Sequence, residues 1–212
     1  MAEIKKEIAR PESSSVQRAR AFSSATLHEA MGRKGALPYG IKPIAPEMRL
    51  CGPAITVSSP PMDNLMIHRA LYVAQPGDIL VVEVGGAYEA GYWGEIMTCA
   101  AQQRGIAGLV IDGCVRDGAL IHKMGFPVFS RGLSIRGTKK EGGGFVNSPV
   151  KIGDITIHPG ELIVGDSDGV VVVQREEIDR ALAEAQKREE KEEGIKKELA
   201  AGKTTLEIYG FR

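Results

Sequence analysis

Two acidic residues and one arginine, Glu95, Arg116 and Asp117, have the types and spacing that metal-assisted or acid–base chemistry needs. Glu95 follows Gly94 beyond one buried apolar run, and the Arg-Asp pair follows Gly113 beyond another. If these runs are neighbouring parallel strands, the three side chains converge at the carboxyl edge of one sheet. Two carboxylates suit a divalent cation such as Mg²⁺, and an arginine can hold a carboxylate or stabilise a developing oxyanion. The alternative is structural, with the two acids capping helices and the arginine as their ion-pair partner.

The elements that must position these residues form a predicted β-α-β-α-β series. Strands are predicted at 76–86, 107–113 and 126–132, and helices at 95–105 and 116–125. The first two strands are apolar runs, which is typical of parallel strands buried on both faces, and each helix closes at a glycine. Short connections of this kind give parallel strands with helical crossovers. The helix N-termini would then offer free N–H groups and a positive dipole end to a substrate carboxylate.

The flanking segments are predicted to complete one α/β domain. Helical spacing occupies 16–32, with Ser23 or Ser24 as the cap of a second helix, and short antiparallel or mixed strands occupy 150–173. The remaining predicted elements are a strand at 49–59, a well-buried helix at 64–75 and a long charged helix at 175–200. We divide the chain into an N-terminal arm at 1–15, an α/β domain at 16–174, and a C-terminal helix and tail at 175–212.

The long C-terminal helix interrupts its own apolar stripe with charge. The stripe runs through Ile178, Leu182 and Ala185, and Glu192 then occupies it. A polar residue in an apolar stripe is costly unless it is satisfied. Glu192 therefore either faces solvent where the helix leaves the body, or reaches the site of a neighbouring subunit.

Composition argues against several classes of protein. The formal net charge is zero, so there is no electrostatic footprint for nucleic acid or an anionic membrane. No run of about 18 apolar residues exists, and the N-terminal residues lack an apolar signal core. We expect a cytoplasmic protein with neither nucleic acid nor membrane as a partner. The widely spaced Cys51, Cys99 and Cys114 are expected to be buried free thiols.

Two glycine-containing motifs are predicted to be structural. GDSDG at 165–169 resembles the start of a calcium loop, but it lacks the later acidic positions and reads as a tight turn between strands. GGG at 142–144 lacks the Lys-Ser/Thr of a P-loop and the strand-to-helix setting of a dinucleotide fingerprint. We interpret it as a flexible loop.

Three stretches of the sequence match a known pattern: GEIMTCAAQQRGIAGLVIDGCVRD, GFPVFSRG and PGELIVGDSDGVVVV. Through them the chain resembles the RraA-like family over roughly residues 22–212. That family includes the class II 4-hydroxy-4-methyl-2-oxoglutarate/4-carboxy-4-hydroxy-2-oxoadipate (HMG/CHA) aldolases and the regulator of ribonuclease activity A. The resemblance implies a layered β/β/α fold of the swivelling-domain type with a long C-terminal helix. It also implies a homotrimer or hexamer with sites between subunits.

The resemblance implies a metal site. In the aldolases an acid, usually Asp, stands twenty-one positions before an Arg-Asp pair, and here Glu95 has that spacing. The regulators have Gly at this place, so Glu95 favours the enzyme. Asp117 would be the direct ligand of Mg²⁺ or Mn²⁺, with Glu95 and a neighbouring subunit's Glu192 contacting the metal through water. Glu189 is the alternative to Glu192.

The resemblance also implies how a substrate is held and cleaved. Arg116 would contact the keto oxygen and stabilise the enolate, and backbone N–H groups of Glu95, Ile96 and Met97 would bind the pyruvyl carboxylate. The reaction would be retro-aldol cleavage of a 4-hydroxy-2-keto dicarboxylic acid, in which water or hydroxide held by the acids takes the C4 hydroxyl proton. The same enolate chemistry would permit oxaloacetate decarboxylation. The alternatives are a related lyase for another 2-keto acid, and a non-catalytic regulator of a ribonuclease acting by protein contact.

Overall fold

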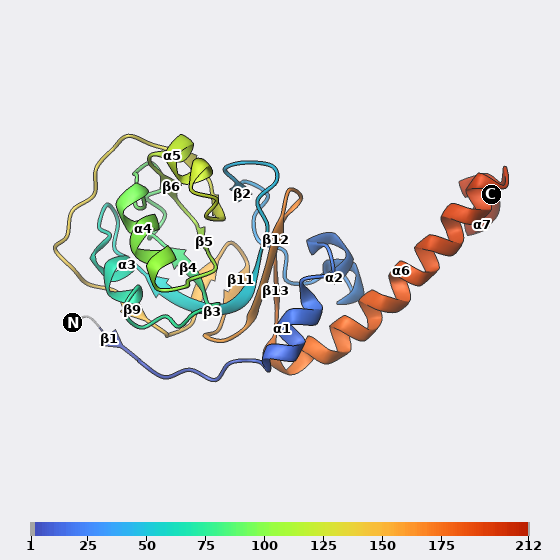
Figure 1. Ribbon diagram of the computed structural model, residues 1–212, viewed down its shortest axis with the longest axis horizontal. Helices are drawn as coiled ribbons and strands as arrows, with labels where there is room; N and C mark the ends of the chain where they lie inside the picture. The colour runs from blue at the N-terminus through green and yellow to red at the C-terminus, as the bar shows by residue number, and fades with distance from the viewer. Residues whose placement is uncertain (1–2, 212) are drawn as a thin grey trace.

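Four parallel strands form the centre of the fold (Figure 1). The computed structural model describes residues 3–211, so residues 1, 2 and 212 of the predicted arm and tail lie outside the described part. The four strands, in spatial order, are β3 (Leu50–Ser58), β4 (Ile79–Glu83), β5 (Gly108–Ile111) and β7 (Val128–Ser130). They confirm the predicted parallel series.

The sheet is buried on both faces, as the uniformly apolar strands predicted. Along β4, Leu80 and Val82 pack into the core under the helices, whereas Ile79 and Val81 pack into the core of the opposite face. The helical layer consists of α3 (Leu65–Ala70), α4 (Glu95–Gln103) and α5 (Gly118–Lys123). Because side chains alternate along a strand, one short strand contributes to both cores.

The second layer is antiparallel, as predicted for 150–173. β12 (Leu162–Asp166) pairs with β13 (Gly169–Val173) and also, antiparallel, with the first half of β3. The two residues between β12 and β13 form the tight turn predicted within 165–169. The hairpin of β10 (Val150–Ile152) and β11 (Ile155–Ile157) packs against the same core.

Several two-residue strands join distant segments and were not predicted. They are β1 (Glu3–Ile4), β2 (Lys42–Pro43), β6 (Cys114–Val115), β8 (Gly132–Leu133) and β9 (Phe145–Val146). Each pairs with a strand far away in the sequence or at an edge, so local periodicity carries no signal for it.

The helices outside the central layer pack on the β12–β13 hairpin. They are α1 (Ser13–Ala19), α2 (Ser24–Ala30) and the first turns of α6 (Ile178–Ala200), which follows the 3₁₀ turn η1 (Arg175–Glu177). Ser23 caps α2, and its hydroxyl accepts a hydrogen bond from Thr26 N at 3.0 Å. The predicted break between two N-terminal helices is therefore confirmed, although α1 begins inside the segment predicted as an arm.

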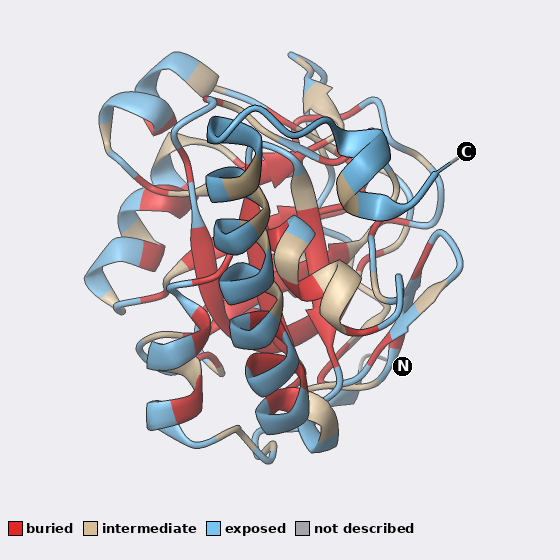
Figure 2. Ribbon diagram, turned by 90° about the vertical axis from the view of Figure 1, so that its right-hand side faces the viewer, coloured by how far each residue is buried: buried red, intermediate tan, exposed pale blue. Residues whose placement is uncertain are grey.

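The C-terminal helix leaves the body of the protein (Figure 1), and most of its residues are exposed (Figure 2). Its buried residues are Ile178, Ala181, Leu182 and Ala185, and none of its described residues is buried beyond Ala185. The short helix α7 (Thr205–Tyr209) ends the projection. An α/β fold with a long C-terminal helix is thus confirmed. Within residues 3–211, no helix has the length and apolar character needed to cross a membrane.

The cysteines are free but not uniformly buried. Cys51 is buried, Cys114 is half-buried and Cys99 is exposed on α4. The prediction of buried thiols is therefore wrong for Cys99, because that position lies on the solvent face of a helix whose buried residues are Met97, Thr98 and Ala101.

The N-terminal segment is tied to the body by a buried ion pair. Arg10 donates two hydrogen bonds to the carboxylate of Asp78, at 2.9 and 2.8 Å. The Asp78 residue is only 1% exposed, and its Oδ2 also accepts from Gln75 N at 2.7 Å. The Lys5 carbonyl of this segment also accepts a hydrogen bond from Asn147 Nδ2 at 2.9 Å.

We expect Arg10→Ala to lower the free energy of unfolding by about 3 kcal/mol, because it leaves a buried carboxylate without its cation. The control is Arg18→Ala, which removes an exposed ion pair with Asp179 and should change that free energy by about 0.5 kcal/mol or less. Urea unfolding at pH 7 measures both variants. Equal losses in the two would contradict the interpretation.

Candidate functional site

The helices α4 and α5 begin side by side, and one carboxylate joins them. Asp117 Oδ2 accepts a hydrogen bond from Glu95 N, the first N–H of α4, at 3.2 Å. Its other oxygen lies 3.6 Å from Arg116 Nε. Arg116 N donates to Trp93 O at 2.8 Å, which ties the start of α5 to the segment entering α4. The predicted convergence of the two strand ends is therefore present.

The backbone of Asp117 is unusual. It is the N-cap residue of α5, with φ 61° and ψ 32°, and its side chain makes no cap hydrogen bond to its own helix. A left-handed conformation is uncommon outside glycine and costs about 1–3 kcal/mol. The carboxylate instead caps the neighbouring helix. The capping interpretation of this acid is thus correct in part, because the bond it makes also fixes its position beside Arg116.

Two glycines allow this close approach. A Cβ atom on Gly94 would lie 2.6 Å from Asp117 Oδ2. A Cβ atom on Gly91 would lie 2.7 Å from Ser134 O and 2.9 Å from Arg116 Cβ. At Gly91 the closest atom belongs to the backbone, so a side chain does not fit there, whereas at Gly94 a Cβ atom would force the Asp117 carboxylate to shift.

A cavity of about 280 Å³ brings five of the six predicted site residues together. Its lining includes Glu95, Ile96, Met97, Arg116 and Asp117. Arg116 is exposed and Glu95 and Asp117 are half-buried, so all three charges are accessible from solvent.

The predicted carboxylate-binding N–H groups are not equivalent. Glu95 N is already engaged by Asp117, and bonding within α4 begins with Thr98 N, which donates to Gly94 O at 3.0 Å. The N–H groups of Ile96 and Met97 belong to the first turn, which lacks intrahelical acceptors. They are the two groups available to an anion at this helix end.

Beyond its glycines and Tyr92, the cavity has four lining residues that were not predicted. They are Asn64 and His68 from the start of α3, and Thr138 and Lys140 from the site loop, which we define as residues 137–142. The pKa of His68 is lowered by burial and by the charge of Lys140, so this imidazole is neutral at pH 7. The spacing of Asn64 and His68 on one helix face was a signal, but nothing local connected that helix with the loop.

The same cavity supplies the donor set that a hard divalent cation prefers. Asp117 and Glu95 provide carboxylate oxygens, and Mg²⁺ commonly binds one or two carboxylates with water and substrate completing its shell. Among residues 3–211 no group of three or more His, Cys, Asp or Glu side chains could hold a metal ion. Any cation bound here would therefore have fewer than three such protein ligands from one chain.

The sixth predicted residue, Glu192, lies elsewhere in the chain. It is on the projecting part of α6 and pairs with Arg188, whose Nε is 2.9 Å from its Oε1. Arg188 also lies 3.7 Å from Glu29 on α2. Glu189 and Glu192 line a different cavity beside Thr26. One chain does not bring Glu192 to Glu95, and its action in a neighbouring subunit stays a prediction.

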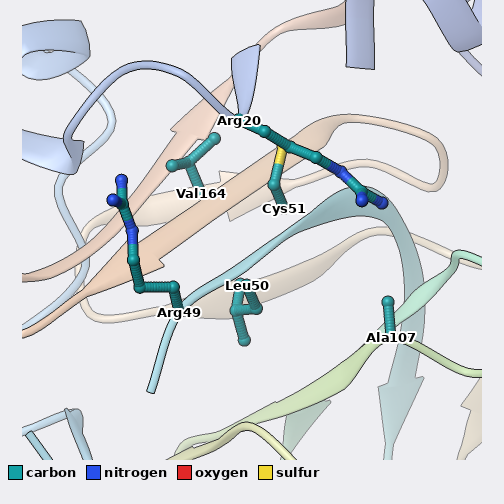
Figure 3. Close-up of a pocket in the computed structure, with 6 residues that line it drawn as sticks. All are labelled: Arg20, Arg49, Leu50, Cys51, Ala107 and Val164. Carbon is teal, nitrogen blue, oxygen red and sulfur yellow. The ribbon is translucent and has the colours of Figure 1, made fainter. Parts of the chain in front are cut away.

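Another cavity, of about 290 Å³, contains none of the predicted residues (Figure 3). Arg20 and Arg49 flank Cys51 there, with Leu50, Ala107 and Val164 completing the wall. Burial raises the pKa of the Cys51 thiol to about 11, although the two arginines lower it slightly. A thiol that is protonated at neutral pH is a poor nucleophile. Cys51 is therefore not an activated nucleophile.

Comparison with known proteins places the chain in a family. The RraA-like family, described as Aldolase/RraA, matches residues 24–172. The chain belongs to the RraA-like family. This RraA-like chain is 33% identical over 190 residues to a protein of Halalkalibacterium halodurans with the provisional name 4-hydroxy-4-methyl-2-oxoglutarate aldolase, and the match covers 90% of each chain.

Solved structures agree with this membership. The RraA-like chain matches a crystal structure of an uncharacterized protein from Pseudomonas syringae pv. tomato with a TM-score of 0.80 and 31% identity, over 93% of this chain and 97% of that one. It matches Streptomyces coelicolor RraAS2, described as an unusual member of the RNase ES inhibitor RraA protein family, with a TM-score of 0.79 and 29% identity, over 89% and 100%. The RraA-like fold class is thereby confirmed, and the family contains proteins named for two different activities.

We expect Gly94→Ala to lower the free energy of unfolding by about 1–3 kcal/mol, because the new Cβ collides with the Asp117 carboxylate. The fluorescence of Trp93, the single tryptophan, should change too, since its Nε1 donates to Thr98 Oγ1 in the first turn of α4. Gly194→Ala is the control, because it has open space on exposed α6 and should raise the same free energy by up to about 1 kcal/mol. Unchanged stability and fluorescence in Gly94→Ala would contradict the steric argument.

Proposed function

We propose that this protein is a class II, divalent-metal-dependent aldolase, a carbon–carbon lyase that releases pyruvate. Its substrate would be a 4-hydroxy-2-keto dicarboxylic acid of the 4-hydroxy-4-methyl-2-oxoglutarate type. The observation that carries the proposal is the convergence of Glu95, Arg116 and Asp117 on one cavity at the N-terminus of α4. The provisional aldolase name of the Halalkalibacterium halodurans relative supports it.

Each residue has a role that its position supports. Asp117 would be the direct ligand of Mg²⁺ or Mn²⁺, and Glu95 would contact the ion through water. The bound ion would supply Lewis-acid polarisation of the 2-keto oxygen. Arg116, exposed at the cavity, would donate hydrogen bonds to that oxygen as it gains negative charge. The N–H groups of Ile96 and Met97 would hold the adjacent carboxylate.

The proton and the electron pair then have defined destinations. Water or hydroxide beside the Glu95 carboxylate would accept the proton of the C4 hydroxyl group. The C3–C4 bond breaks, the C4 hydroxyl carbon becomes a carbonyl, and the bonding pair forms the pyruvate enolate. Protonation at C3 completes pyruvate. Loss of CO₂ from oxaloacetate would leave the same enolate, so one site would serve both reactions.

The alternative is a non-catalytic regulator of a ribonuclease acting by protein contact. The observation that favours it is the structural match to RraAS2 of the RNase ES inhibitor family. An acid at position 95 argues for the enzyme, because the regulators that the sequence resembles have Gly there. A regulator would produce no pyruvate from either substrate, with or without metal.

We expect Arg116→Ala and Asp117→Ala each to reduce pyruvate formation by at least about 100-fold, because each removes charge stabilisation from the transition state. The matched control is Arg136→Ala, which should keep full activity, because this exposed arginine has a single ion pair among residues 3–211, with Glu89 at 3.8 Å. A coupled pyruvate assay on oxaloacetate and 4-hydroxy-4-methyl-2-oxoglutarate measures the rates. Mg²⁺ should support turnover and a chelator should abolish it. Metal-dependent turnover retained in both variants would refute the assignment.

A mixing experiment tests whether Glu192 acts in a neighbouring subunit. Glu192→Ala and Asp117→Ala should each be inactive alone. In a homotrimer co-assembled from both, about a quarter of interfaces would combine an intact Asp117 with an intact Glu192 and regain activity. Glu190→Ala, on the same helix and bonded to Gln186, serves as the control and should stay active. If the mixed oligomers recover no activity, Glu192 does not act in the site of a neighbouring subunit.

A further inference from the structure

Asp63 is a buried carboxylate that is bonded by N–H groups from two separate segments. It is only 4% exposed. Its Oδ1 accepts from Leu65 N, at the start of α3, at 2.9 Å. Its Oδ2 accepts from Glu141 N at 2.5 Å and from Gly142 N at 3.1 Å, both in the site loop. One side chain therefore bridges a helix start and a loop that lies 78 residues later in the chain.

This carboxylate differs from the other buried aspartates in its partners. Asp78 pairs with Arg10, Asp112 with Arg131, and Asp166 bonds the hydroxyl and N–H groups of Ser24. Asp63 has neither a bonded cation nor a hydroxyl partner among its described hydrogen bonds, and backbone N–H groups alone satisfy it. Burial acts to raise its pKa, but these N–H groups and the charge of Lys140 outweigh it and hold the pKa below its usual value. The group is charged at neutral pH, so its bonds are charge-assisted and strong.

The backbone beside Asp63 makes the same connection. Lys139 N donates to Met62 O at 2.7 Å, and Asn64 N donates to Lys139 O at 3.1 Å. These bonds form a parallel bridge between Asp63 and Lys139. The surface pair between Lys139 and Glu141 is largely exposed and contributes little. The bridge thus holds the middle of the site loop at Lys139, and the Asp63 carboxylate holds its end at Glu141 and Gly142.

Three consecutive glycines at the end of the site loop and just after it let the chain make this contact. Gly142, Gly143 and Gly144 all have positive φ, between 84° and 102°. A Cβ atom on Gly144 would lie 2.0 Å from Ser58 O, so the chain passes against β3 without room for a side chain. The GGG run that reads as a flexible loop in the sequence has a defined path here, and that path brings Gly142 N onto Asp63.

The held loop forms part of the candidate site. Gly137, Thr138 and Lys140 line the same cavity as Arg116 and Asp117. At its other end the segment is anchored where Gly91 N donates to Arg136 O at 2.8 Å. Asp63 itself does not line the cavity. Its effect on the site must therefore pass through the loop or through the start of α3, where Asn64 and His68 also line the cavity, and the loop receives two of its three N–H bonds.

We propose that Asp63 is a positioning residue for the reaction, whose carboxylate holds residues 137–142 so that Thr138 and Lys140 form a wall of the substrate cavity. This inference rests on the proposed function of that cavity. Without the carboxylate, the loop loses the two N–H bonds that fix its end at Glu141 and Gly142, and Lys140, the residue before them, is no longer held at the cavity wall.

The first test measures the loop directly. Lys139 and Lys140 are trypsin sites, and mass spectrometry reports cleavage after each. In Asp63→Asn the amide oxygen cannot accept hydrogen bonds from both segments, so a charge-assisted bond that closes the loop is lost. Trypsin cleavage in the loop should therefore be about tenfold or more faster than in the wild type. Asp63→Ser, which keeps one acceptor for Leu65 N, should show the same rise with α3 better preserved. Asp168→Asn, an exposed aspartate, is the control and should cleave like the wild type.

The second test separates positioning from general damage. A loss of folded enzyme lowers kcat and leaves KM unchanged, whereas a displaced Lys140 should raise KM about tenfold. Lys140→Met should raise KM by itself, and adding Asp63→Asn to it should raise KM no further, because both changes act through one residue.

The outcomes are distinguishable. Unchanged loop cleavage in both Asp63 variants would overturn the inference, as would faster cleavage with an unchanged KM, or fully additive effects of the two substitutions. An absence of turnover in the wild-type protein would refute the proposed function, and with it the role of residues 137–142 in the reaction. The cleavage rates would still decide whether Asp63 holds residues 137–142.

Discussion

The hydrogen bond from Glu95 N to the Asp117 carboxylate is the constraint on which the site depends. It joins the first turn of α4 to the residue that starts α5, and so it links two successive βα units at the edge of their sheet. The close approach behind this bond is accompanied by a left-handed backbone at Asp117 and by glycines at positions 94 and 91, where a Cβ atom would meet Asp117 Oδ2 and Ser134 O. Negative charge at a helix N-terminus is favourable, which offsets part of the backbone strain. The parallel register of β4 and β5 brings the two helix starts to the same level.

The sequence was sufficient for the parts of the fold that local patterns determine. The apolar runs of β4 and β5 and the glycines after α4 and α5 gave strands and helices near their observed positions. Parallel pairing then followed from the short connections, and the convergence of the site residues followed from pairing. The two-residue strands and the length of α3 were not accessible in this way. They depend on partners that are distant in the chain, for which periodicity contains no information.

The same limit explains which site residues the sequence could not supply. Lys140 enters the cavity because the chain returns from the edge of the sheet across α3, and the bonds that fix this return go to Asp63. A lone Asp before a helix reads as a cap, and it does accept from Leu65 N as a cap would. Its second oxygen carries the additional role. Capping and positioning use different oxygens of one carboxylate here, so residue type alone does not separate them.

Glu192 shows a comparable ambiguity. Its carboxylate is paired with Arg188 in the chain, and its side chain stays 41% exposed, so solvent and an ion pair already satisfy it. The helix that carries it has no buried residue beyond Ala185, although Leu206, Tyr209 and Phe211 follow with substantial exposed apolar area. A helix whose apolar end is uncovered loses little by packing against another surface. The charge pattern of α6 is thus compatible both with a solvated helix and with one that docks on a neighbour.

The charges around the cavity constrain the charge of the substrate that the proposed reaction could accept. Glu95 and Asp117 are balanced by Arg116 and Lys140, and His68 adds no charge because burial and Lys140 lower its pKa. Under the proposed mechanism a divalent cation would add two positive charges to this balanced set, and a neighbouring subunit's Glu192 would compensate one of them. The carboxylate of a 2-keto acid would compensate the other. This balance depends on Lys140 being held where the site loop places it.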